Sequence, residues 1–179
     1  MRSVVISILI NAIAASVLAA DPTIDNLTAT AANGKVSAHF TLLNAFDRAE
    51  IVQGLQSGVP TSFGYVVEVY RARPSWFDEG IDRSHIEVIA TFNSVTREYL
   101  MNYRRDRKLV RSETFTDLEK LEKRMTTIDE PDLFDVGNRR PYKLRLRVKA
   151  DLMRGWALYF IPWNFSTRWR DVRIAEAKP

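Results

Sequence analysis

The sequence predicts a mainly β protein, an antiparallel β-sandwich that is immunoglobulin-like in architecture and carries two short helices. Apolar and charged residues alternate over 142–152 with the period of two expected of a strand that has one buried face. The pair Asn33-Gly34 favours a tight hairpin, because both residues tolerate positive φ. Short helical patterns occur only over 47–56 and 116–127. A single curved sheet with the helices on one face is the alternative.

The N-terminal part of this pattern is a hairpin followed by a helix. The runs 24–31 and 35–43 are predicted strands on either side of the Asn-Gly turn. Asp47 and Glu50 have the spacing of a capping box, so we expect the first helix to start there. Gly58 suits the left-handed position after the end of that helix.

The middle of the chain reads as a series of strands. The run 61–73 is apolar on both faces, which predicts a central strand, and 78–84 is a predicted polar connection. Strands are then expected over 86–92, 95–103 and 109–115, with a charged turn over 104–108.

A second helix and two further strands complete the predicted domain. Thr116 and Glu119 form a capping box for a helix that ends near Thr127. An acidic loop is expected over 129–138, then the alternating strand to residue 152. The last edge strand is expected over 168–174.

The first twenty residues read as an export signal. Arg2 precedes an apolar stretch, and Val17-Leu18-Ala19 offers a cleavage site for signal peptidase. We therefore expect residues 1–20 to be a signal peptide, residues 21–179 to form one β-rich domain, and the protein to be periplasmic. An uncleaved N-terminal helix in the inner membrane is the alternative, because the apolar stretch approaches the span of about 17–25 residues that a bilayer needs.

Composition and motifs point away from several function classes. The chain has 179 residues, a net charge of +4 and no cysteine, and its acidic and basic residues are interspersed. We expect no nucleic-acid partner, because no basic tail or cluster of motifs supports one. His39 and His85 are the only histidines, and neither stands in a known catalytic or metal-ligand spacing, so we expect no enzyme activity, cofactor or metal.

Two groups of residues are candidates for an interaction surface. The first is a row of four cations on the polar face of the alternating strand. Acidic side chains of adjacent strands, Glu68, Glu87 or Glu98, are expected to neutralise this row. The alternative is that an anionic partner does so. The second is a set of aromatic residues, which suit a protein or bilayer interface when exposed and a core when buried. The cations are Lys143, Arg145, Arg147 and Lys149, and the aromatic residues are Trp76, Phe77, Trp156, Tyr159 and Trp163.

Several groups of residues together resemble a proteobacterial family, domain of unknown function 4390. They are Leu42-Leu43-Asn44-Ala45-Phe46, Leu55 with Ser57-Gly58-Val59-Pro60, Val69-Tyr70-Arg71 with Arg73-Pro74-Ser75-Trp76-Phe77-Asp78, Thr96-Arg97-Glu98-Tyr99, and Tyr142-Lys143-Leu144-Arg145-Leu146-Arg147. The resemblance implies a small exported or membrane-anchored protein, often encoded beside a membrane sensor histidine kinase of the nitrogen-regulation type.

Residues and resemblance together predict a non-catalytic interaction module of the bacterial envelope. Its expected partner is an envelope or membrane protein, with the sensor kinase favoured by the family context, and contact with the membrane surface is a further expectation. The alternative is a sandwich that binds a lipid or small ligand in its apolar interior. A hydrolase is the third and least favoured hypothesis.

Overall fold

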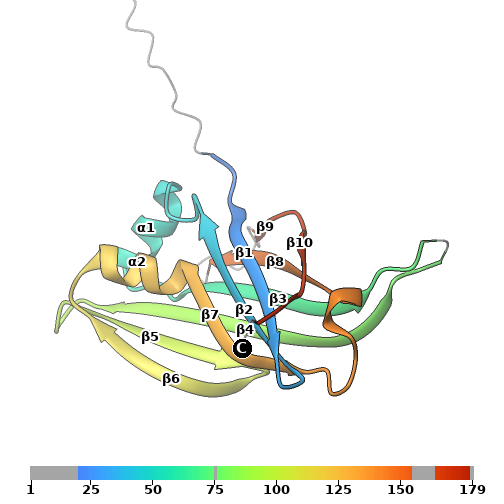
Figure 1. Cartoon of the computed structure of the whole chain (residues 1–179). Coiled ribbons are helices and arrows are strands. Elements are labelled where there is room, and N and C mark those ends of the chain that lie inside the picture. Colours follow the sequence, from blue (N-terminus) through green and yellow to red (C-terminus); the bar gives the residue numbers. More distant parts are fainter. Residues whose placement is uncertain (1–19, 75, 155–163, 178–179) are drawn as a thin grey trace, which may run out of the picture.

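A computed structural model shows two β-sheets packed face to face (Figure 1). It describes residues 20–74, 76–154 and 164–177. The predicted sandwich with two helices is confirmed, and the sheets do not close into a barrel. All strand pairs are antiparallel in the described residues except β1 with β11.

The smaller sheet, sheet A, has the strand order β11-β1-β2-β7. Its strands are β1 (Thr23–Ala32), β2 (Lys35–Leu43), β7 (Thr127–Asp135) and β11 (Ala175–Glu176). The larger sheet, sheet B, has the order β10-β8-β3-β4-β5-β6, and β9 also pairs with β8. Its strands are β3 (Thr61–Arg71), β4 (Glu79–Asn93), β5 (Glu98–Arg105), β6 (Lys108–Phe115), β8 (Arg145–Arg154), β9 (Asn164–Ser166) and β10 (Arg170–Arg173).

The helices α1 (Ala49–Gln56) and α2 (Leu118–Thr126) lie together at one end of the sandwich (Figure 1). The core lies between the two sheets. Phe40 of β2 packs edge-to-face on Tyr65 of β3 with ring centroids 5.3 Å apart, and both side chains are almost fully buried. The Tyr65 hydroxyl donates to the Met125 carbonyl of α2 at 2.8 Å, so the core also holds the helical end in place.

Local sequence patterns explain the two best-defined turns. Asn33 and Gly34 have φ values of 51° and 76°, as the type I′ prediction requires. A Cβ at Gly34 would also stand 2.9 Å from the Gly137 carbonyl oxygen. Both the positive φ and this close approach therefore require glycine at position 34. The prediction for Gly58 is confirmed as well, because it follows α1 with φ 80°.

Four strand predictions need correction. Residues 129–135 of the predicted acidic loop belong to strand β7, which begins at Thr127. This strand buries Ile128 and Phe134 in the core. The stretch 78–84 is the start of β4, where the buried Ser84 donates to Asp106 at 3.1 Å. Residues 95–97 form a turn instead of a strand, and the Asn93 side chain accepts the amides of Val95 and Thr96.

The strand predicted from residue 142 starts later, at Arg145. A 3-10 turn, η1 (Pro141–Lys143), precedes it, and the Leu144 amide donates to the Pro141 carbonyl at 2.8 Å.

The predicted capping boxes are also wrong. The cap residue of α1 is Arg48, without a side-chain bond, and Asp117 caps α2 by accepting the Glu119 amide. The edge strand predicted over 168–174 is confirmed with narrower bounds as β10, but it is not the last strand, because β11 follows it.

Candidate functional site

The β3–β4 hairpin carries two adjacent aromatic residues into solvent. Its tip projects at the end of the molecule opposite the helices (Figure 1). Trp76 is 75% exposed and Phe77 is 87% exposed, although each such side chain buries about 150–250 Å² when it is enclosed. An exposed aromatic pair at a projecting tip is a candidate contact site.

Ion pairs hold the two arms of the hairpin together just below this tip. Arg71 and Arg73, at the end of the first arm, contact the Glu79 carboxylate of the second arm at 3.2 and 2.6 Å. The hydrogen bond from Arg73 lowers the pKa of the Glu79 carboxyl from its ordinary value, and the charges of both arginines act in the same direction. These ion pairs therefore link the two arms of the hairpin next to Trp76 and Phe77.

The row of cations on β8 is neutralised by the protein itself. Arg145 contacts Asp171 of β10, Arg147 contacts Glu68 of β3, and Lys149 contacts Asp151. Lys143 is exposed in η1, so it does not continue the row. Of the acidic residues considered for this role, Glu68 is confirmed, whereas Glu87 pairs with Arg104 and Glu98 stands opposite Asn93.

Glu68 is the centre of a polar cluster on the outer face of sheet B. It is only 5% exposed and holds two arginines, Arg147 with Nε 2.6 Å from Oε2, and Arg83 at its other oxygen. The Arg147 guanidinium also lies 4.9 Å from the Tyr70 ring and 4.8 Å from the Trp169 ring. Because these charges satisfy one another, an anionic ligand would have to displace a buried carboxylate.

Tyr70 closes the same cluster on its other side. Its hydroxyl donates to Asp171 at 3.3 Å. Burial raises the pKa of Tyr70 above its ordinary value, and the negative charge of Asp171 raises it further. Sequence reasoning missed Tyr70 and Trp169, since only the order of strands β3, β8 and β10 brings them to Arg147.

The other aromatic candidates and the histidines are placed differently. Trp156, Tyr159 and Trp163 lie outside the described residues. His39 stands on the outer face of sheet A, 3.9 Å from the exposed Asp129. His85 is exposed on sheet B beside a shallow hollow of about 580 Å³, and within the described parts of the chain no group of three or more acidic or histidine residues could hold a metal.

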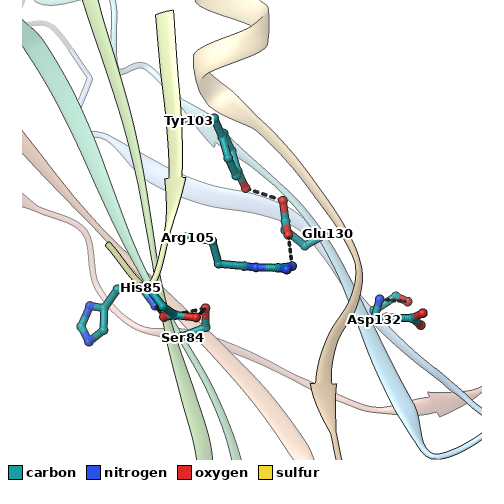
Figure 2. A network of polar contacts seen from close by, with 8 residues as sticks. Ser84, His85, Tyr103, Arg105, Glu130 and Asp132 are labelled. Atoms are coloured by element: carbon teal, nitrogen blue, oxygen red, sulfur yellow. Dashed lines mark hydrogen bonds and ion pairs between the residues drawn. The ribbon is translucent and has the colours of Figure 1, made fainter. Parts of the chain in front are cut away.

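A buried carboxylate joins the two sheets (Figure 2). Glu130 of β7 is 5% exposed and accepts hydrogen bonds from two residues of β5, the Tyr103 hydroxyl at 2.6 Å and Arg105 at 2.9 Å. The imidazole of His85 points away from this network in Figure 2. All three groups satisfy one another, and the contact links β7 of sheet A to β5 of sheet B.

The buried tyrosines predict a loss of stability at alkaline pH. Burial raises the pKa of the Tyr65 and Tyr103 hydroxyls, and for Tyr103 the bond to Glu130 raises it further. In the unfolded chain both hydroxyls have a pKa of about 10. Their contribution to stability is therefore complete below that pH and falls as the pH rises above it. Tyrosinate absorbance should therefore show part of the tyrosines titrating together with unfolding. Titration of all six near pH 10 with the fold intact would contradict this.

Fold and site together define a small two-sheet β-sandwich whose strongest surface feature is an aromatic hairpin tip. The sequence of residues 19–173 matches the family described as Domain of unknown function (DUF4390), and the chain belongs to that family. No curated protein and no solved structure matches the chain.

Proposed function

We propose that this protein is a non-catalytic interaction module that binds an envelope protein through the tip of its β3–β4 hairpin. The observation that carries the proposal is the exposure of Trp76 and Phe77, 75% and 87%, side by side at a projecting tip. Tryptophan and other aromatic residues are the side chains most often responsible for binding energy at protein interfaces.

The charge around the tip favours a protein partner over a lipid surface. Attraction to an anionic leaflet needs several unpaired basic residues next to the inserted aromatic residues. Here Arg71 and Arg73 are both engaged by Glu79, and Asp78 adjoins Phe77. A hydrophobic pocket on a protein would enclose the two rings without demanding that charge.

The family context supports a particular partner class and compartment. The export pattern of residues 1–20 supports a location outside the cytoplasm, and residues 1–19 lie outside the described part of the chain. In the described parts of the chain, no helix has both the length and the apolar character to cross a bilayer. We infer that the partner is the region of a membrane sensor kinase outside the cytoplasm.

The packing of the sandwich argues for a surface function. Its interior is filled by large side chains with less than 2% exposure. They include Phe40, Phe63, Tyr65, Met101, Tyr103 and Met125. This density supports an interaction module over a protein that binds a ligand between its sheets.

Cross-linking in cells tests the proposal at the level of single positions. Phe77 of the full chain is replaced by a photoreactive phenylalanine derivative, and Val95 is replaced in the same way as the control, because Val95 is 90% exposed at the β4–β5 turn. We expect a covalent product with the sensor kinase from position 77 and none from position 95. The same products from both positions, or no protein product from position 77, would refute the proposal.

A further inference from the structure

We propose that strand β6 forms the interface between two copies of this chain by antiparallel pairing of β6 with β6. Strand β6 is an edge of sheet B, and no strand in the described parts of the chain pairs with its outer side. An unpaired edge presents a row of backbone donors and acceptors that a further strand can bind. This inference concerns a different surface from the hairpin tip.

The other sheet edges carry features that discourage pairing. Strand β7 contains Pro131, which has no amide hydrogen, and Asp132 with φ 51°, and its ladder with β2 is shifted in register. Strands β10 and β11 are only four and two residues long. Short or interrupted edges of this kind are the usual protection against unwanted strand addition.

Strand β6 is eight residues long, and the irregularity in its ladder with β5 is a register shift at Val110, outside residues 111–115. It contains neither proline nor glycine, and it leaves Leu109 60% exposed and Val110 50% exposed. Exposed apolar side chains beside free backbone groups favour the addition of another strand. The edge therefore has both the backbone and the side chains of an interface.

The charges of β6 are complementary to those of a second β6 strand in one register. A two-fold axis through Ser112 places each Arg111 opposite the partner's Glu113, twice in the dimer. An axis through residue 111 would instead place Arg111 opposite the partner's Arg111, and an axis through residue 113 would place Glu113 opposite the partner's Glu113. Like charges directly opposite each other are destabilising. Both side chains are about one third exposed, 33% and 35%, so both can reach a partner.

The surroundings of these charges fit the same register. Arg111 lies over the Tyr103 ring at 4.1 Å, and Glu113 contacts Arg111 of its own chain at 3.5 Å and Arg124 of α2 at 3.1 Å. Two arginines thus share one carboxylate in each copy, and a partner's carboxylate would stand next to Arg111. Because a single pair of edge strands buries little surface, the dimer is expected to depend on concentration.

Single cysteines test both the dimer and its register, because the chain contains no cysteine of its own. Ser112→Cys places the two sulfur atoms on either side of the two-fold axis, where directly opposite Cβ atoms stand about 4.5–5.5 Å apart, near disulfide range. Thr114→Cys is the matched control, since it is exposed like Ser112 but its two copies would lie about 13 Å apart.

We expect mild oxidation of the full chain to give a covalent dimer from Ser112→Cys and several-fold less from Thr114→Cys. In the Ser112→Cys background, Arg111→Glu alone and Glu113→Arg alone should each reduce the dimer, and a mixture of the two should restore it as a heterodimer. Equal cross-linking at positions 112 and 114, no cross-linking at 112, or no recovery in the mixture of folded variants would overturn the proposal.

Discussion

Glu130→Ala is expected to lower the free energy of unfolding by about 2–3 kcal/mol. The change removes the acceptor of the Tyr103 hydroxyl, and the Tyr103 side chain is fully buried. It also removes the partner of Arg105, whose side chain is 39% exposed and can turn to solvent. The loss therefore stays below the roughly 3–5 kcal/mol that breaking a fully buried charge pair costs. Urea unfolding measures this loss as a lower midpoint concentration, and the m value is expected to stay unchanged.

Two further variants separate this buried contact from a general effect of losing a surface charge. Glu87→Ala removes a carboxylate whose pair with Arg104 is 44–45% exposed, so its expected cost is about 0–1 kcal/mol. Tyr103→Phe removes only the hydroxyl, and combining it with Glu130→Ala should cost less than the sum of the two changes. Equal losses in Glu130→Ala and Glu87→Ala would show that Glu130 does not hold the sheets together.

The alternation of residue types was enough to predict the architecture because it reports burial directly. On β8 the side chains of Leu146, Val148 and Ala150 are buried while Arg145 and Arg147 face outward, as the period of two requires. The same rule failed for β7, where Pro131 and several carboxylates hide a strand that is tied to the core at Ile128 and Phe134. Tertiary packing there overrides a local composition typical of loops.

The site could be predicted only in part, because its residues meet across strands whose order is not written in the local sequence. Trp76 and Phe77 were identifiable as aromatic neighbours beside Pro74, but their exposure depends on the long hairpin that projects them. Trp169 reaches Arg147 only because β10 pairs with β8. The cations of β8, chemically the most conspicuous group in the sequence, are instead engaged by carboxylates of the same chain.

Replacement of both tip aromatics is expected to have the largest effect on binding. The variant Trp76→Ala with Phe77→Ala removes two rings that are largely exposed and are not members of the buried core, so stability should change by no more than about 0.5 kcal/mol. If both rings are enclosed by the partner, affinity should fall about 100-fold or more. Val95→Ala, at another exposed turn, is the matched control and should bind like the unchanged chain.

The most direct test of the tip as the docking site is the dissociation constant of the full chain for the kinase region outside the cytoplasm. We expect measurable binding by the unchanged chain and by Val95→Ala, and a loss of affinity of about 100-fold or more in the double tip variant, with unchanged thermal unfolding. Equal affinity of the double variant, or no binding by the unchanged chain, would contradict it.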